Sequence, residues 1–337
     1  MGTTRWPHGR RLSRNRRPHA PRRRVSRPES PLSLLPRVPP RRAEHPRRVR
    51  DVELVHTHTP FALGLAGLRL AARADVPLVA TYHTPTSEYA SYLAAGGRLG
   101  GGVERLSEAY ERWFFDRVDA ILVPSEATRR HLTESVGVES EVTVLPNGVD
   151  LDRFRPVDAA AFRERYGLGS GPLVGYTGRH GYEKRLRDAV DAAANVDATL
   201  VFGGDGPARD DLEARADDRG VDARFLGFLD RDELPAFYSA LDAFVFPSPV
   251  ETQGLVALEA VACGTPVVAA DEGALASTVV DGATGYHFPT GDVDALAATI
   301  TRTLDERESL GERCLELRGE YGVERAVDRL QAVYDRL

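Results

Sequence analysis

Two glutamates eight residues apart stand where a predicted strand gives way to a predicted helix. The segment Pro247–Leu255 follows an apolar strand, and the helix it opens reaches Glu259, so Glu251 belongs to the connecting loop. The first N–H groups of a helix have no partner within it, so the amides of residues 252–256 are suited to a phosphate or diphosphate. The two carboxylates could accept hydrogen bonds from sugar or ribose hydroxyls. The alternative is an ordinary capped helix with a surface glutamate.

Two cations follow the first predicted strand of the second half of the chain. Arg179 comes directly after Gly175–Gly178, and Lys184, the only lysine in the sequence, follows five residues later at the expected start of a helix. A guanidinium fork and an ammonium at the carboxyl end of a parallel strand can clamp a diphosphate. A surface ion pair with Glu183 is the alternative.

A third strand-to-helix turn, Gly203–Pro207, is rich in glycine. Turns of this kind favour glycine whatever their function. Because this one shares a predicted sheet edge with the other two motifs, Gly204 and Gly206 fit the wall of a nucleotide pocket.

Histidines end two apolar strands in the first half, in Val55–Pro60 and Ala80–Pro85. A metal site is one interpretation, but no carboxylate or cysteine joins them at ligand spacing. We expect His56 and His58 to be strand-end residues with satisfied hydrogen bonds. His83 is the functional candidate, because it opens a polar loop that extends to Tyr92.

The elements that must position these residues alternate between apolar strands and helical patterns, which predicts an α/β fold with parallel sheets. Expected strands cover residues 52–56, 77–82, 119–123, 141–145, 172–177, 198–202, 222–226, 243–247 and 266–270. Expected helices include 61–74, 103–118, 125–135, 292–305, 307–319 and 323–336.

This pattern predicts two doubly wound, Rossmann-like domains that face a cleft, the default ligand site. The domains are expected at residues 51–148 and 149–320, with a hinge at Leu145–Asp150. A last helix at 321–337 is expected to return toward the first domain. The first domain is short, with about four strands where a full Rossmann-like half has six or more.

Residues 1–50 differ from the rest, with sixteen arginines, nine prolines and only two glutamates. They carry a net charge of +14, whereas residues 51–337 hold 28 basic and 48 acidic residues, a net of −20. A start or frame artefact, a disordered tail, a targeting peptide and a basic arm for nucleic acid or anionic lipid are the interpretations, and we favour the first. The acidic, lysine-poor remainder resembles proteins of extreme halophiles.

No apolar run approaches the roughly 20 residues that span a bilayer, which indicates a cytoplasmic or peripheral membrane protein. Two cysteines cannot form a disulfide framework. In 103–118, Leu106, Tyr110, Trp113 and Phe114 recur at helical spacing among arginines. We favour a core-packing helix over a membrane-surface helix here.

The sequence resembles retaining family 4 glycosyltransferases of the GT-B fold over about residues 51–320. Its motifs stand in the order that this family shows. They are Tyr82–Pro85, the hinge Pro146–Asp150, Arg179 with Lys184, Gly204–Pro207, and Glu251 with Glu259.

The resemblance implies a role for each site residue. Arg179 and Lys184 would hold the donor diphosphate near Gly254 and Leu255, Glu259 the donor ribose, and Glu251 the transferred sugar. His83 would lie against the reacting sugar, and Phe228 and Leu229 would border the base. The donor would be a UDP- or GDP-linked hexose, used without a metal or other cofactor.

Thr84–Tyr89 and Gln253 resemble glycolipid synthases that act on diacylglycerol-type lipids, so a membrane lipid is one candidate acceptor. Polyprenyl-linked, polysaccharide and small-molecule acceptors are the others. Family members begin with a strand and a glycine-rich loop that residues 1–50 do not supply, so the first sheet is expected to lack its N-terminal strand. The alternatives are an inactive nucleotide-binding fragment and a nucleotide-sugar 2-epimerase, and nucleic-acid binding ranks third.

Overall fold

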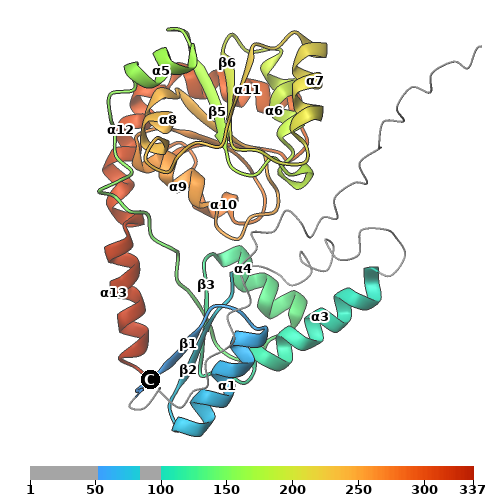
Figure 1. The fold of residues 1–337 in the computed structure, drawn as a ribbon, viewed down its shortest axis with the longest axis vertical. Helices are drawn as coiled ribbons and strands as arrows, with labels where there is room; N and C mark the ends of the chain where they lie inside the picture. Colours follow the sequence, from blue (N-terminus) through green and yellow to red (C-terminus); the bar gives the residue numbers. More distant parts are fainter. Residues whose placement is uncertain (1–51, 84–99) are drawn as a thin grey trace, which may run out of the picture. The chain divides into compact units, whose positions relative to one another are not determined.

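The computed structural model describes residues 52–83 and 100–337, with side chains from residue 105 onward in the second range. All of these residues belong to one compact unit, Pro46–Leu337. Their strands form two separate sheets, both entirely parallel (Figure 1). The expectations for residues 1–50 and for the loop at residues 84–92 concern segments that lie outside the described residues.

The first sheet pairs its described strands in chain order, β1-β2-β3-β4, and forms what we call the first half. Every residue of β2 is buried, as parallel strands covered on both faces require. The strands are β1 Val55–Thr57, β2 Leu78–Thr81, β3 Ala120–Val123 and β4 Val142–Val144. The helices are α1 Ala62–Ala74, α3 Gly100–Phe115 and α4 Glu126–Arg130, the last continued by a π-helical turn at His131–Val136.

The second sheet has the order β10-β9-β8-β5-β6-β7 and forms the second half. Its strands are β5 Leu173–Thr177, β6 Thr199–Gly203, β7 Ala223–Gly227, β8 Ala243–Phe246, β9 Val267–Ala270 and β10 Gly285–Phe288. Its helices are α5 Ala160–Tyr166, α6 Leu186–Ala193, α7 Arg209–Arg219, α8 Leu234–Ala240, α9 Leu255–Ala262, α10 Leu275–Thr278, α11 Val293–Asp305 and α12 Arg307–Leu317.

The expected strands are all present within three residues at each end, and β10 is an addition that the sequence analysis missed. This strand has only four residues and includes a glycine and a half-buried histidine, so its apolar signal is weak. It pairs with β9 at the edge of the sheet.

Strand order in the second sheet reverses between β5 and β8, which are neighbours in the sheet although β6 and β7 come between them in the sequence. In open α/β sheets the crevice outside the carboxyl ends of the strands at such a reversal is the usual ligand site. The segments that leave β5 and β8 carry Arg179, Lys184 and Glu251. The topology therefore brings the predicted cations and the predicted glutamate loop to one place.

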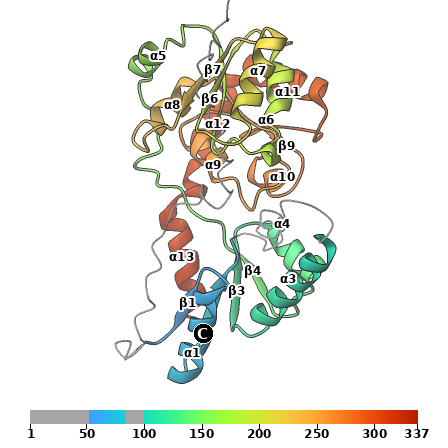
Figure 2. The ribbon, with the colours of Figure 1, turned by 45° about the vertical axis from the view of Figure 1, so that its right-hand side comes forward.

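The chain passes between the halves twice, and the two passages run side by side. Val149 forms a parallel bridge with Gly322, just after a 3₁₀ turn at Arg318–Tyr321. The last helix, α13 (Val323–Tyr334), then packs Val333 against Val79 and Leu122 of the first sheet (Figure 2). Among the described residues, none of the helices has the length and apolar character needed to cross a membrane.

Candidate functional site

Lys184 and Glu251 form an ion pair across the point where strand order reverses. The Nζ atom of Lys184 lies 2.6 Å from Oε1 of Glu251, and the two side chains are 19% and 14% exposed. Lys184 ends a 3₁₀ turn, Tyr182–Lys184, and α6 begins two residues later. Lys184 thus reaches the loop after β8, whereas the surface ion pair with Glu183 that was the alternative is formed by Arg179.

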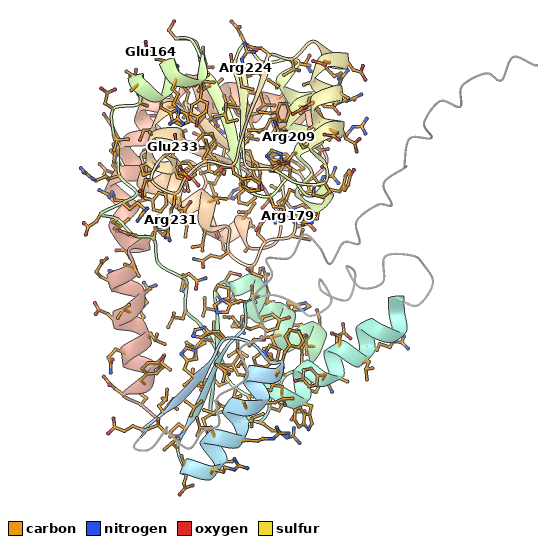
Figure 3. The ribbon with its side chains drawn as sticks, viewed as in Figure 1. Glu164, Arg179, Arg209, Arg224, Arg231 and Glu233 are labelled. Carbon is orange, nitrogen blue, oxygen red and sulfur yellow. The ribbon has the colours of Figure 1, made fainter. Side chains whose placement is uncertain are left out.

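Arg179 follows β5 and pairs instead with Glu183, at 2.8 Å. Figure 3 shows Arg179 at the carboxyl-terminal edge of the second sheet, whereas Arg224 lies at the opposite edge. Each of the two cations expected to hold a diphosphate therefore has a carboxylate partner within its own half.

The helix that follows the glutamate loop has no side-chain cap. Gly254 is its N-cap residue, with φ of 80°, a left-handed conformation that favours glycine. A Cβ atom at this position would also lie 2.6 Å from Cδ2 of Leu275. Of the amides of residues 252–256 that were expected to be free donors, only those of Leu255 and Val256 belong to the first turn of α9, because the helix begins at Leu255. The alternative of a helix capped by a side chain is wrong.

Glu259 lies one turn into α9, not two, since the helix begins later than the sequence suggested. The hydroxyl of Tyr238 donates a hydrogen bond to Oε2 of Glu259, at 2.7 Å. Burial raises the pKa of Glu259, and it also raises the pKa of Tyr238. Tyr238 thus fixes one carboxylate oxygen of Glu259, a role for which its sequence position in α8 gave no signal.

The turns after β5, β6 and β7 are connected by backbone hydrogen bonds. Gly178 N–H donates to Gly203 O at 3.1 Å, and Gly204 N–H donates to Gly227 O at 2.6 Å. A Cβ atom at Gly204 would collide with the carbonyl of Gly178. The third turn therefore needs glycine for close backbone packing, whatever it contacts in addition.

The region around these turns holds a fully buried histidine that the sequence analysis did not single out. His180 directly follows Arg179, and its Nε2 lies 3.2 Å from the carbonyl oxygen of Gly203. Burial lowers the pKa of His180, which favours the neutral ring. A Cβ atom at Gly206 would lie 2.5 Å from the carbonyl oxygen of His180, and Ala208 N–H donates to the same oxygen at 2.9 Å. Its adjacency to Arg179 was the one available sequence signal.

Phe228 and Leu229, which follow β7, differ in their surroundings. Phe228 is 83% exposed, whereas Leu229 packs against the core of the second half. Leu229 also lies beside Gly203, so it belongs to the same edge as the glycine turns.

The histidines of the first half form a chain of contacts. His83 Nε2 lies 2.9 Å from His58 Nδ1, and His58 stacks on His56 with ring centroids 4.3 Å apart. His56 is hydrogen-bonded at both nitrogens, to Tyr334 (2.6 Å) and to Thr81 (2.7 Å), which confirms the expectation for that residue. Burial lowers the pKa of His83, and burial together with the other two rings lowers the pKa of His56 to about 4. The rings of His56 and His83 are therefore neutral at pH 7.

A metal site is not formed by these rings. Within the part of the chain that the structure describes, no group of three or more His, Cys, Asp or Glu side chains is arranged to hold a metal ion.

The helix α3 has two different faces. Phe114 and Phe115 are fully buried, as expected for a core-packing helix, but Leu106 is 72% exposed and Trp113 is also exposed. Tyr110 stacks on Trp113 and donates to the carbonyl of Pro60, just before α1. The core-packing interpretation is thus wrong for Leu106 and Trp113.

A cavity of about 340 Å³ lies beside residues 145–150, which we call the linker between the halves. None of the predicted donor residues lines it. Its walls include Pro124, Ser125, Asn147, Gln253, Thr278, Tyr321 and Arg329. Arg179, Lys184 and Glu251 lie instead at the strand reversal of the second sheet, which is the position that topology favours for a ligand.

Comparison with known families matches both halves of the chain. Residues 4–153 match the family described as Glycosyltransferase Family 4, and residues 158–316 match Glycosyl transferases group 1. The first match extends through most of the arginine-rich segment.

Two relatives illustrate the range of named activities. The chain is 34% identical to 2-deoxystreptamine glucosyltransferase of Streptomyces kanamyceticus, with 86% of this chain and 79% of that protein covered. It is 31% identical to alpha-monoglucosyldiacylglycerol synthase of Streptococcus pneumoniae, with 80% and 64% covered. The chain thus spans less than two thirds of the second relative.

Solved structures confirm the expected fold. Sucrose-phosphate synthase of Thermosynechococcus elongatus superposes with a TM-score of 0.73 at 27% identity, covering 84% of this chain and 73% of that chain. HepE of Anabaena, in complex with UDP and glucose, superposes with a TM-score of 0.73 at 21% identity, covering 85% and 78%. At 21% identity the second likeness shows the fold alone.

Proposed function

Because the chain belongs to the group 1 and family 4 glycosyltransferases, we propose that it moves a hexose from a UDP- or GDP-linked sugar to an acceptor hydroxyl with retention of anomeric configuration. The observation that carries the proposal is the Lys184–Glu251 pair at the strand reversal, beside the uncapped start of α9. A cation, a carboxylate and helix amides at this place match the charges of a sugar diphosphate.

In the proposed donor complex, Lys184 and Arg179 hold the diphosphate together with the first amides of α9. The negative phosphate replaces carboxylates as the partner of both cations, which frees Glu251 to accept hydrogen bonds from the hexose. Glu259, held by Tyr238, binds the ribose. Leu229 and the turns at Gly204 and Gly206 border the nucleotide, and Phe228 covers the base.

The proposed reaction forms a bond between the acceptor oxygen and the anomeric carbon on the face that the leaving group occupies. The bond from that carbon to the diphosphate oxygen breaks, and the acceptor proton passes to the departing phosphate. Lys184, Arg179 and the start of α9 stabilise the negative charge that develops on the diphosphate, so the proposal requires no metal ion. His83, as a neutral ring, lies against the reacting sugar from the first half.

A diacylglycerol-type lipid is the proposed acceptor, which would place the protein peripherally on the inner face of the cell membrane. The name of one relative supports this class. Four exposed apolar side chains supply a surface for it: Phe61 and Leu63 at the start of α1, and Leu106 and Trp113 on α3. Two exposed arginines accompany them, Arg105 on α3 and Arg117 just after it. Aromatic and arginine side chains together suit the interface of an anionic bilayer.

The experiment is a turnover assay with UDP- and GDP-linked hexoses against lipid, sugar and small-molecule acceptors, in the presence of EDTA. We expect one nucleotide sugar to be consumed only when its acceptor is present, and NMR of the product to show the donor's anomeric configuration. Formation of an epimeric nucleotide sugar without an acceptor would contradict the proposal in favour of an epimerase. Inversion of configuration would contradict the mechanism alone.

A further inference from the structure

The linker between the halves is hydrogen-bonded on two sides. On one side, Val149 N–H donates to Tyr321 O at 2.7 Å, and Val149 O accepts from Val323 N–H at 2.9 Å. On the other side, Asn147 meets the loop that carries Glu251. The contact on that second side goes through a single side chain, Gln253.

Gln253 directs its side-chain amide to one residue. Its Oε1 accepts hydrogen bonds from the backbone N–H of Asn147 (2.9 Å) and from Asn147 Nδ2 (2.6 Å), and its Nε2 donates to Asn147 O (3.0 Å). The residue is only 4% exposed. Both lone pairs of the oxygen are therefore used, and the residue also borders the cavity beside the linker. The interpretation of Gln253 as a direct sign of the acceptor gains no support from this arrangement.

The loop around Gln253 carries residues proposed to touch the donor. Two positions earlier, Glu251 pairs with Lys184, and one position later Gly254 begins the first turn of α9. The backbone carbonyl of Gln253 accepts a hydrogen bond from Thr278 Oγ1, at 2.6 Å. Gln253 is therefore fixed to α10 by its backbone and to the linker by its side chain.

A second contact connects the same loop to the first half. Thr128 of α4 donates its hydroxyl to Thr252 O at 3.2 Å, and Ser125, the N-cap residue of α4, lies 2.9 Å from that hydroxyl. Glu251, Thr252 and Gln253 are thus three consecutive residues with contacts to the second half, the first half and the linker respectively.

We propose that Gln253 and Asn147 are positioning residues that couple the linker to the donor loop, Glu251–Leu255. This inference rests on the proposed function, because it assumes that the loop binds the donor. The pair sets the position of Glu251 and of the start of α9 relative to the linker. Movement of the linker is then transmitted to the donor site through three hydrogen bonds.

The geometry gives the two residues unequal weights. Gln253→Met keeps the length of the side chain but removes all three hydrogen bonds, and it leaves the N–H and C=O of Asn147 without these partners. Asn147→Ala removes only the bond from Nδ2, because the other two involve its backbone. Buried hydrogen bonds to neutral groups are worth about 1 kcal/mol each, or roughly fivefold in an equilibrium constant.

The experiment combines amide hydrogen exchange with steady-state kinetics on the full chain. We expect Gln253→Met to increase exchange of residues 250–256 and to lower kcat/KM for the nucleotide sugar roughly 100-fold, mainly through kcat. Asn147→Ala should lower it about fivefold, and the double variant should match Gln253→Met, because no hydrogen bond remains for the second change to remove. Thr303→Val, which removes a buried hydrogen bond within α11, is the matched control and should leave both readouts unchanged.

The two readouts separate the inference from the proposed function. Unchanged exchange of residues 250–256 in Gln253→Met, or a double variant whose effect is the product of the single effects, would overturn the coupling. If Gln253→Met does not fold, Asn147→Ala carries the test, and wild-type exchange and kinetics in that variant would overturn it. A wild-type chain that uses no nucleotide sugar contradicts the proposed function, whereas the exchange result still decides whether the linker and loop are coupled.

Discussion

The candidate functional residues of the two halves differ in charge: those of the second half are mostly charged and paired, and those of the first half are histidines. In the second half, the cations and carboxylates proposed to bind the donor are partnered with one another or with a tyrosine, as in Lys184–Glu251, Arg179–Glu183 and Tyr238–Glu259. In the first half, the rings of His56, His58 and His83 are stacked in a row, and burial lowers the pKa of His56 and of His83. In the second half, a charged ligand can replace one member of an existing ion pair, whereas in the first half the lowered pKa values of His56 and His83 favour uncharged rings.

The two halves should therefore respond to different changes, the second to loss of a charged side chain and the first to pH. A diphosphate can replace a carboxylate beside Lys184 with little change in local charge balance, so the second half should be sensitive to loss of either charge. The first half should be sensitive to protons instead, because the neutral rings of His56 and His83 become charged at acidic pH. Variants and pH can therefore test the halves separately.

The largest effect is expected for Lys184→Met. This change removes a cation from the diphosphate and leaves the mostly buried Glu251 without its partner. Truncation of one member of a buried charge pair costs about 2–5 kcal/mol, so kcat/KM should fall roughly 30- to several-thousand-fold. Arg224→Met, at the opposite edge of the same sheet, is the control and should retain wild-type kinetics. Similar losses in both variants would remove Lys184 from the site.

Glu259→Gln is expected to lower kcat/KM about 10- to 100-fold, because hydrogen bonds to a charged group are worth roughly 1.5–3 kcal/mol. Tyr238→Phe removes only the group that orients this carboxylate and should lower kcat/KM by less, about fivefold. Steady-state kinetics of the two variants measures this order. The reverse order would show that Tyr238, and not Glu259, makes the decisive contact.

Activity is expected to fall at acidic pH through the first half. The pKa of His83 is lowered below 6.5 by burial, so the ring is neutral at pH 7 and becomes charged as the pH drops. The pH profile of kcat/KM should be flat near neutrality and fall by up to tenfold per unit once His83 is protonated. His83→Gln should lower activity and remove this acidic limb. An unchanged limb in that variant would assign the titration to another group.

Stability is expected to follow the same direction through His56. Its pKa is about 4 in the folded chain and 6.5 in the unfolded chain, so the unfolded state binds more protons between these values. The contribution is complete above pH 6.5 and is lost as the pH falls toward 4. The loss should be about 2 kcal/mol in the free energy of unfolding, less than the full pKa shift implies because the ring is only half buried. Urea unfolding of wild type and His56→Gln at pH 7 and pH 4.5 would measure it, and equal pH dependence in both would refute it.

The smallest effect is expected for Phe228→Ala. The side chain is 83% exposed, so its loss costs the free chain little, but it would stack on the proposed nucleotide base. The KM for the donor should rise about fivefold with kcat unchanged, in keeping with about 1 kcal/mol for an aromatic contact. Val327→Ala, an exposed apolar residue of α13, is the control. A KM that does not change would leave Phe228 outside the donor site.

The sequence predicted the alternation of strands and helices because buried parallel strands are nearly continuous apolar runs, as in Leu78–Thr81. It missed β10, whose four residues include Gly285 and His287. It also placed the start of α9 too early. The glycine at position 254, which favours a left-handed backbone, delays the helix to Leu255.

Only those residues of the candidate site that stand in sequence motifs could be predicted. Glu251, Lys184 and Arg179 stand in recognisable patterns, but their partners depend on tertiary structure. Nothing in the spacing of Tyr238 and Glu259 predicts their hydrogen bond, because they belong to different helices. The same is true of Asn147 and Gln253, which are 106 residues apart.

The second half is proposed to hold a nucleotide diphosphate at Lys184 without a metal ion. Calorimetric titration of UDP and GDP in EDTA, into wild type, Lys184→Met and Arg224→Met, tests it most directly. We expect one nucleotide to bind wild type and Arg224→Met equally and to bind Lys184→Met at least 30-fold more weakly. Equal affinity in Lys184→Met, or binding to wild type only after a divalent metal is added, would contradict the claim.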